Sequence, residues 1–142
     1  MGTHRFTVHI DVPPERVFDL WTNLDRAHEW IEGLTGHTDV TGPIDQVGTR
    51  YTARFGSMSS PTEVLEVERP RVFRTRFGNR LLAGESRATF EPEDRGTWLT
   101  QEFVTKGVVP AIAAWIFSIG SYRGSFRGEL NAFAKIAERE RS

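Results

Sequence analysis

The last third of the chain carries one continuous apolar stripe, and this stripe constrains the fold more than any other part of the sequence. About thirty residues follow Pro110 without another proline. We therefore expect a long C-terminal helix, roughly 45 Å in length at 1.5 Å per residue, with its stripe covered by a broad and curved partner. At 100° per residue, one side of the helix collects Val108, Ile112, Trp115, Ile116, Ile119, Phe126, Leu130, Phe133, Ala134 and Ala137.

Short alternating segments, separated by glycine and proline, fill most of the remaining chain. Phe6, Val8 and Ile10 alternate with polar residues, which predicts a first strand that ends at Asp11. The same alternation occurs in segments 48–55, 63–68, 71–77, 86–90 and 97–105, and segment 91–96 has the composition of a turn. Consecutive antiparallel hairpins of this kind form a twisted sheet with one apolar face. About six strands are expected between the first strand and the C-terminal helix.

Two short helices are predicted directly after the first strand. Pro14 suits the first turn of a helix over about residues 14–22, where its missing N–H leaves no bond unmade. Asn23 and Asp25 offer a cap for a second helical segment that carries Trp30 and stops at Gly33. The expected fold is α+β, with a curved antiparallel sheet wrapped around the long C-terminal helix.

Length and composition limit the class of protein. The 142 residues fit a single domain, 1–142, and the net charge of −1 gives no general attraction to nucleic acid. The absence of cysteine excludes disulfides and favours a cytoplasmic location. The most apolar window, 108–119, is shorter than the ~20 residues that cross a bilayer, and the N-terminus lacks the apolar core of a signal peptide. No transmembrane segment is expected.

Two stretches of the sequence are similar to a known group of proteins. The first is Asp11-Val12-Pro13-Pro14-Glu15-Arg16-Val17-Phe18-Asp19-Leu20-Trp21, and the second is Thr62-Glu63-Val64-Leu65-Glu66-Val67-Glu68-Arg69-Pro70-Arg71. They resemble the START-like (SRPBCC) superfamily, in particular its polyketide cyclase/dehydrase and lipid-transport branch, and the resemblance extends from about Arg5 to Arg139. It implies the helix-grip fold of START and Bet v 1-like proteins, with a hydrophobic cavity between sheet and C-terminal helix. The superfamily includes carriers, receptors and cyclases, so the resemblance leaves the chemistry open.

Arg123 is the single charged residue inside the apolar stripe. Its guanidinium either reaches the edge of the helix, meets an internal acidic partner, or binds an anionic or carbonyl group of a ligand. Glu63 shares a strand parity with Leu65 and Val67, which makes it the first internal partner to test, and the same parity turns Gln101 toward the cavity. A β-bulge would turn either residue to the other face, and an ordinary surface position is the first expectation for both.

The other candidate ligand-binding residues are apolar or aromatic, and each also fits an ordinary core position. They are Trp115, Ile119, Phe126 and Leu130 from the helix, Tyr51, Phe73 and Phe103 from the sheet, and Trp30. Gly120, Gly124 and Gly128 lie four residues apart in the same helix. Such a spacing permits close packing of another segment, a bend, or a contact between two copies in a homodimer.

No motif for a metal or cofactor is present. The four histidines lack metal-site spacing, although His28 or His37 could transfer a proton near a pocket mouth, and no strand is followed by a phosphate-binding glycine loop. We therefore expect cofactor-free binding of a small hydrophobic or amphipathic molecule, by a carrier or sensor. The alternative is a polyketide cyclase/dehydratase in which Arg123 stabilises an enolate. A filled interior would instead indicate a protein-interaction role.

Overall fold

The computed structural model describes the chain except for residues 1, 32, 56–57, 79–82, 107–121 and 141–142. The side chains of residues 2, 58, 105–106 and 122–127 are also outside the description. The elements in chain order are β1 (Gly2–Ile10), α1 (Pro14–Trp21), the 3-10 helix η1 (Ala27–Glu29), β2 (Gly36–Thr38), β3 (Arg50–Phe55), β4 (Met58–Glu68), β5 (Val72–Gly78), β6 (Ala83–Glu93), β7 (Gly96–Lys106) and α3 (Tyr122–Arg139).

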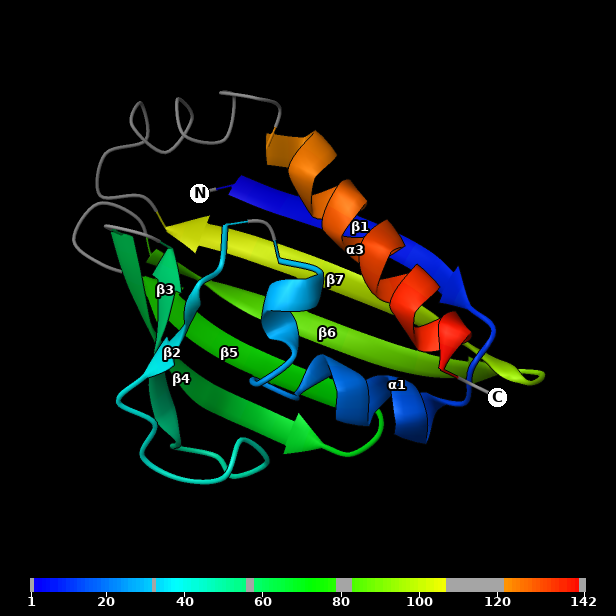
Figure 1. Ribbon diagram of the computed structural model, residues 1–142, viewed down its shortest axis with the longest axis horizontal. Helices are drawn as coiled ribbons and strands as arrows, with labels where there is room; N and C mark the ends of the chain where they lie inside the picture. Colours follow the sequence, from blue (N-terminus) through cyan, green and yellow to red (C-terminus); the bar gives the residue numbers. More distant parts are fainter. Residues whose placement is uncertain (1, 32, 56–57, 79–82, 107–121, 141–142) are drawn as a thin grey trace.

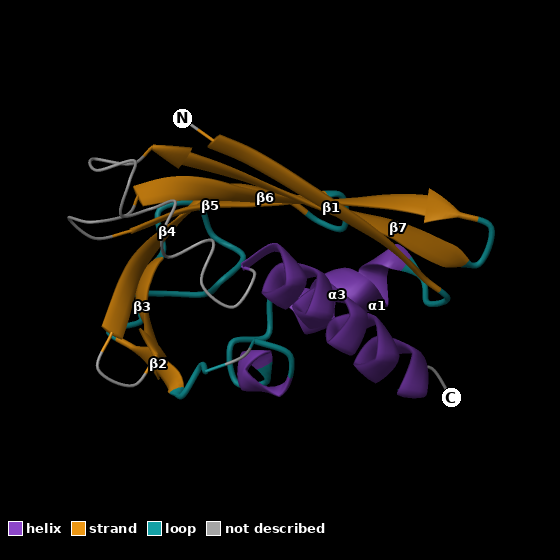
Figure 2. Cartoon of the chain, turned by 90° about the horizontal axis from the view of Figure 1, so that it is seen from above, coloured by secondary structure: helices purple, strands orange, loops and turns teal. Residues whose placement is uncertain are grey.

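One antiparallel sheet contains all the described strands, in the order β1-β7-β6-β5-β4-β3-β2. Strands β2 to β7 pair with their neighbours in sequence, whereas β1 pairs with β7. The sheet is curved, and α1 and α3 lie on its concave side (Figures 1 and 2). This arrangement confirms the predicted α+β helix-grip architecture. The predicted C-terminal helix is observed over Tyr122–Arg139, and its earlier part lies outside the described residues.

The first residues of α1 favour the start of a helix at this point of the chain. Pro13 is the N-cap and Pro14 the first helical residue, and Glu15 places a carboxylate in the first turn, at the positive end of the helix. Thr22 ends the helix, and its hydroxyl donates to the carbonyl of Phe18 at 2.9 Å. The second predicted helix is only the turn η1, because the chain leaves the helical conformation at Trp30.

The β6–β7 hairpin is tighter than the sequence predicted. Residues 91–96 were expected to form the turn, but Pro92 pairs with Thr97 and Glu93 with Gly96. The turn is therefore Asp94–Arg95, with Asp94 in the left-handed conformation at φ 51°. The short strand β2 was not anticipated, since three residues are too few to show an alternating pattern.

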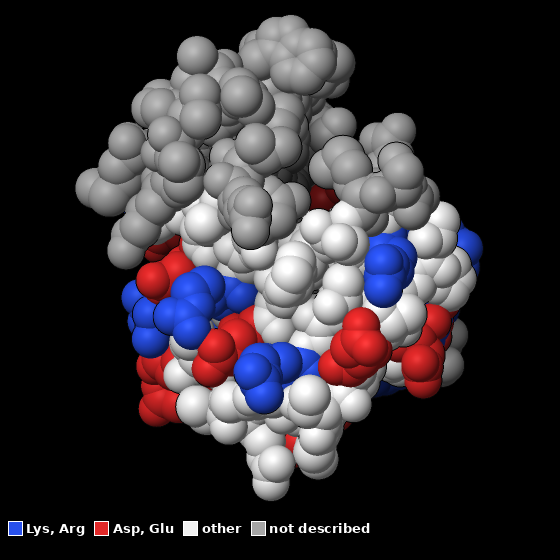
Figure 3. Space-filling view, turned by 90° about the vertical axis from the view of Figure 1, so that its left-hand side faces the viewer, with Lys and Arg blue, Asp and Glu red and all other residues white. Residues whose placement is uncertain are grey.

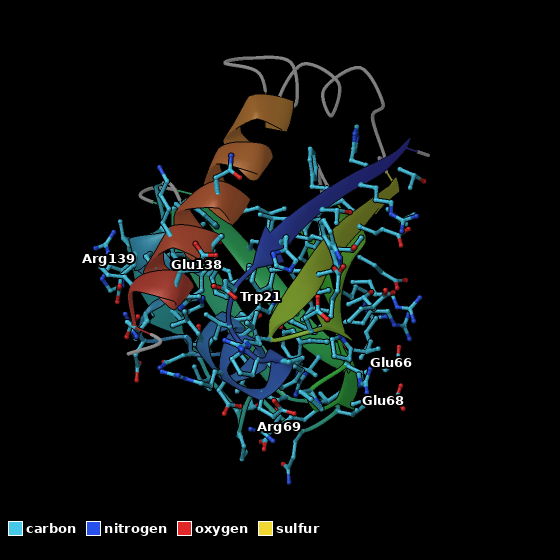
Figure 4. The ribbon with its side chains drawn as sticks, turned by 90° about the vertical axis from the view of Figure 1, so that its right-hand side faces the viewer. Trp21, Glu66, Glu68, Arg69, Glu138 and Arg139 are labelled. Atoms are coloured by element: carbon cyan, nitrogen blue, oxygen red, sulfur yellow. The ribbon has the colours of Figure 1, made fainter. Side chains whose placement is uncertain are left out.

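Aromatic side chains fill the space between the helices and the sheet. Phe133 of α3 contacts Trp21 and Trp30, with ring centroids 5.1 and 4.9 Å apart. Phe18 of α1 contacts Phe90 of β6 at 5.2 Å. Trp21 lies among these interior side chains between the helices and the sheet (Figure 4). This aromatic core fixes α1 and the described part of α3 against β1, β6 and β7.

The outer face of the sheet is covered with alternating charges. Arg74 lies between Glu66 and Glu85, at nitrogen–oxygen distances of 3.3 and 2.7 Å, as expected for pairing across strands. The end of the molecule that carries β2, β3 and β4 likewise shows basic and acidic side chains next to one another (Figure 3). Neither observation indicates a patch of one sign that would attract a polyanion.

Candidate functional site

A β-bulge in β4 determines which of its side chains face the helices. The pairing with β5 shifts between Val64 and Glu66, so that Leu65 is the additional residue. Val64 is fully buried, whereas Glu63 lies on the outer face and accepts a hydrogen bond from Arg76 at 2.7 Å. Of the two positions considered for Glu63, the surface position is the observed one, and its internal position as a partner of Arg123 is wrong. Counting every second residue back from Val67, without the bulge, would place Glu63 on the concave face. The additional residue turns Glu63 to the outer face instead.

The concave face combines aromatic and small polar side chains. Pairing across β3, β4 and β5 aligns Tyr51, Thr62 and Phe77 in one row. The next rows across the face contain Val64, Thr75, Ser86 and Phe103, then Val67, Phe73, Ala88 and Gln101. Parity had predicted the concave face for Tyr51, Phe73, Phe103 and Gln101, and the structure places them there. Binding of a ligand by these residues stays a prediction.

Hydrogen-bonding groups cross the middle of this face. Gln101 of β7 donates from Nε2 to the Ser86 hydroxyl of β6 at 3.3 Å. Thr75 of β5, only 7% exposed, is the partner of Ser86 in the register. Such groups inside an otherwise apolar surface are costly to bury unless they are hydrogen-bonded. Gln101 and Ser86 satisfy one another in part, and each keeps further hydrogen-bonding capacity.

Tyr51 and His37 form an edge-to-face aromatic pair at the β2–β3 end of the sheet. Their ring centroids are 5.3 Å apart, with an angle of 71° between the rings. Burial raises the pKa of Tyr51 to about 12, so its hydroxyl stays protonated at neutral pH. Burial also lowers the pKa of His37, against the opposite effects of the Leu24 carbonyl and the Asp25 carboxylate. A neutral imidazole thus lies beside a protonated phenol.

Several predicted ligand-binding residues belong to the aromatic core instead of the β2–β3 end of the face. Leu130 is 2% exposed, and Trp30 packs on Phe133. Phe73 contacts Phe18 of α1, with ring centroids 6.2 Å apart. Among the described residues, the structure brings Tyr51, Phe103 and Gln101 to the concave face of the sheet and places Trp30 and Leu130 in the hydrophobic core.

Four other predicted residues cannot be placed against this surface. Trp115 and Ile119 lie outside the described residues, and the side chains of Arg123 and Phe126 are also outside the description. The predicted cavity between the sheet and the first part of the C-terminal helix includes these residues. It therefore stays a prediction, as does the role of Arg123 toward an anionic or carbonyl group.

Two grooves lie at the β2–β3 end of the molecule, one lined in part by Tyr51 and the other by His37. The first has a volume of about 480 Å³ and is lined by Asp39, Thr41, Arg50, Tyr51, Thr52, Pro61, Thr62, Glu63, Arg76, Phe77, Gly78 and Ala83. The second, of about 770 Å³, lies between α1 and residues 34–45, and His37 is part of its lining. Most of the side chains of the first groove, including Arg50, Glu63 and Arg76, lie on the outer face of the sheet, whereas the second groove lies on the side of the helices.

Asp19 and Arg69 lie at the second groove, and their side chains are joined by two hydrogen bonds. Arg69 donates to the two carboxylate oxygens of Asp19 at 2.9 and 2.8 Å, and this guanidinium lowers the pKa of the Asp19 carboxyl. Figure 4 labels Arg69 near the end of β4. The contact ties α1 to the segment between β4 and β5.

The sequence did not single out the contact between His37 and Tyr51. His37 was considered only as a proton-transfer group, and Tyr51 only as an aromatic wall. The contact depends on the pairing of β2 with β3, which places His37 opposite Ala53. No local pattern signals this pairing, since β2 is three residues long.

The described residues hold no group of three or more histidine and acidic side chains arranged to bind a metal ion. Within the same part of the chain, no helix has both the length and the apolar character needed to cross a bilayer.

Solved structures share this architecture over nearly the whole chain. A protein of Mesorhizobium loti is 19% identical with a TM-score of 0.76, and 98% of each chain is covered. A Thermobifida fusca protein is 18% identical with a TM-score of 0.77, over 98% of this chain and 95% of the other. DynU16, a protein in the dynemicin biosynthetic locus, is 18% identical with a TM-score of 0.71, over 97% of this chain and 48% of its own. At these identities the likeness shows the fold, which is the SRPBCC-like helix-grip fold.

The family follows from the sequence match. Residues 1–138 match the family described as polyketide cyclase/dehydrase and lipid transport, and the chain belongs to this family. Among proteins with curated descriptions, none is similar enough in sequence to match the chain.

Proposed function

We propose that this protein binds a small, mostly apolar molecule on the concave face of its sheet, without a cofactor, as a carrier or sensor. The observation that carries the proposal is the composition of that face. Phe77 and Phe103 provide apolar area, while Tyr51, Ser86 and Gln101 provide a few hydrogen-bonding groups. Ligand sites combine these features, because apolar area supplies affinity and sparse polar groups fix orientation. Membership of a family described by lipid transport and polyketide cyclisation is consistent with such a ligand.

Retained small molecules provide the direct test. The protein is purified under mild conditions, and mass spectrometry identifies what is released on denaturation. We expect an apolar molecule at close to one per protein chain. Ser86→Phe, which places a ring on the concave face, should lose the molecule, whereas Thr89→Phe on the outer face of the same strand should keep it. Retention by a folded Ser86→Phe protein would contradict the proposal.

A polyketide cyclase/dehydratase activity is the second candidate. The protonated Tyr51 hydroxyl beside the neutral imidazole of His37 favours it, since this combination can donate and accept protons at neutral pH. Arg123→Met separates the two functions if Arg123 acts as the sequence predicts. A carrier should lose affinity for acidic ligands and keep neutral ones, whereas a cyclase should lose turnover by orders of magnitude with binding retained.

A further inference from the structure

The groove of about 770 Å³ between α1 and residues 34–45 combines an apolar floor with a polar rim. Phe18 and Leu34 of its lining are buried, whereas Val40 is 50% exposed. The other apolar side chains of the lining are Leu24, Pro43 and Ile44. The volume is in the range of about 300–1,000 Å³ that small-molecule sites occupy. An apolar group in the groove would remove Val40 from water, which is favourable.

The charges of this groove are not balanced. Its lining contains the three carboxylates of Asp19, Asp25 and Asp45, and Arg69 is its one lysine or arginine among the described residues. Arg69 donates to both carboxylate oxygens of Asp19, at 2.9 and 2.8 Å, so these two charges compensate one another. The groove therefore keeps the negative charges of Asp25 and Asp45.

The carboxylates of Asp25 and Asp45 are exposed and available to a ligand. In the described part of the chain, neither forms an ion pair with a lysine or an arginine. The backbone N–H of Asp25 donates to the Asn23 side chain at 3.1 Å, a contact that does not involve the carboxylate. His37 adds no positive charge at neutral pH, because burial lowers its pKa. A cationic group in the groove would be attracted to both carboxylates.

We propose that this groove is a second binding site, apart from the rows of Ser86 and Gln101 on the concave face, and that it takes a small amphipathic amine. The apolar part of the amine lies along the floor of the groove, while its ammonium group pairs with Asp25 and Asp45. This site goes beyond the proposed function, since it requires no ligand on the concave face. A neutral molecule of the same shape should bind more weakly, and an anion should be repelled.

Three probes with one apolar skeleton test the preference for a cation. 4-Phenylbutylamine, 4-phenylbutan-1-ol and 4-phenylbutanoate end in an ammonium, a hydroxyl and a carboxylate group. Titration of the 15N-labelled protein, followed by 1H–15N NMR at pH 7, gives a dissociation constant for each. We expect the amine to bind about threefold to fivefold more tightly than the alcohol, the effect of an exposed ion pair, and the carboxylate to bind most weakly. High salt should reduce the ratio, because exposed charges are screened.

Two substitutions remove the carboxylates and keep the shape of the groove. Asp25→Asn and Asp45→Asn should each lower the ratio of amine to alcohol affinity by about twofold, and the double variant should lose the preference. Asp94→Asn removes the same charge from the β6–β7 turn, at the opposite end of the sheet (Figure 1). Asparagine tolerates the left-handed conformation of Asp94, so this control should fold and leave the ratio unchanged.

The same spectra show where the amine binds. Its addition should shift the backbone amide resonances of Val40, Ile44 and Asp45, which belong to the groove, and leave that of Gln101 in place. Ser86→Phe, which obstructs the concave face, should leave the affinity for the amine unchanged.

The outcomes separate this site from the proposed function. Equal binding of the three probes, no saturable binding of the amine at millimolar concentration, or a double variant that keeps the preference would overturn the inference and leave the proposed function standing. Loss of amine binding in a folded Ser86→Phe protein would place the amine on the concave face and overturn the separate site. Absence of a retained apolar molecule in the purified protein would count against the proposed function and not against this groove.

Discussion

Arg26 holds both carboxylate oxygens of Glu140 at 2.7 Å, and so joins the segment after α1 to the residue that follows α3. The same guanidinium bonds Glu29 at 2.8 and 2.9 Å. Nearby, the backbone N–H of Asp11 donates to Glu138 at 2.9 Å, and Arg16 donates to the carbonyl of Glu140. The C-terminal end of α3 is thus anchored by polar contacts to the chain that follows β1.

Replacing Arg26 by methionine should loosen this end of the helix. Because the contacts are solvent-exposed, we expect a fall in melting temperature of only about 1–3 °C at pH 7. Lys135→Met, an exposed change on the same helix, is the control, and it should lower the melting temperature by less. Thermal denaturation followed by circular dichroism measures both, and an equal effect of the two changes would show that the anchor adds nothing.

The contacts of Arg26 with the two glutamates also predict how the stability of the protein changes at acidic pH. Arg26 lowers the pKa of Glu140 and of Glu29 in the folded protein, so the unfolded chain takes up protons first as the pH falls. The stabilisation is complete above the ordinary glutamate pKa of 4.5 and is lost as the pH falls through the lower folded values. The difference in melting temperature between wild type and Arg26→Met should therefore shrink below about pH 4.5. A difference that stays constant from pH 7 to pH 3 would contradict this.

Gly96 of the β6–β7 hairpin and Gly128 of α3 differ in whether the structure leaves room for a side chain. A Cβ at Gly96 would lie 2.6 Å from the carbonyl oxygen of Ile10, which is backbone and cannot move aside cheaply. A Cβ at Gly128 of α3 would meet no atom of the described residues within 4 Å. Gly96→Ala should therefore destabilise the protein by about 2 kcal/mol, whereas Gly128→Ala should stabilise it by about 0.5–1 kcal/mol.

Urea denaturation of the two glycine variants measures both changes. Stabilisation by Gly96→Ala would show that β1 and the β6–β7 hairpin do not pack as described. The Gly128 variant also examines the homodimer prediction made for the glycine spacing. If two copies meet at Gly128, the alanine should weaken their association in sedimentation experiments even though it favours the helix.

The lowered pKa of His37 predicts that the protein loses stability in mild acid. Burial lowers its pKa below the ordinary 6.5, so the unfolded chain binds this proton at a higher pH than the folded protein does. The contribution of the neutral imidazole is complete above pH 6.5 and declines as the pH falls from there through the folded pKa. Wild type should therefore lose more stability than His37→Asn between about pH 6.5 and pH 5. Urea denaturation at several pH values measures this, and parallel pH profiles would contradict it.

Most of the fold could be predicted from periodicity, because alternation and helical spacing are local. The alternation of Phe6, Val8 and Ile10 was enough to place β1, and the apolar stripe was enough to expect a helix beyond Tyr122. The site was less predictable, because it depends on which strands pair. The contact of His37 with Tyr51 arises only when β2 pairs with β3, and that strand is too short to recognise.

The bulge in β4 explains why the alternation of the sequence puts Glu63 on the wrong face. Leu65 continues the alternation with Glu63 and Val67 in the sequence, so nothing in the pattern reveals the additional residue. Glu66 and Glu63 both point outward, to Arg74 and Arg76, on either side of the shift. Parity is a property of an uninterrupted strand, and one inserted residue reverses it for everything beyond.

Deleting Leu65 tests this account of β4. Without the additional residue, Val64, Glu66 and Val67 become consecutive opposite the unbroken partner strand β5, so regular alternation keeps both valines on the concave face and Glu66 on the outer face. We therefore expect the deletion variant to fold in the same register and to lose only about 1–2 kcal/mol in the free energy of unfolding, from the half-buried Leu65 side chain and the local bend of the strand. Leu65→Ala keeps the bulge and removes only half-buried side-chain area, so its loss should be about 1 kcal/mol. Urea denaturation compares the two, and failure of the deletion variant to fold would show that Leu65 is not the additional residue of β4.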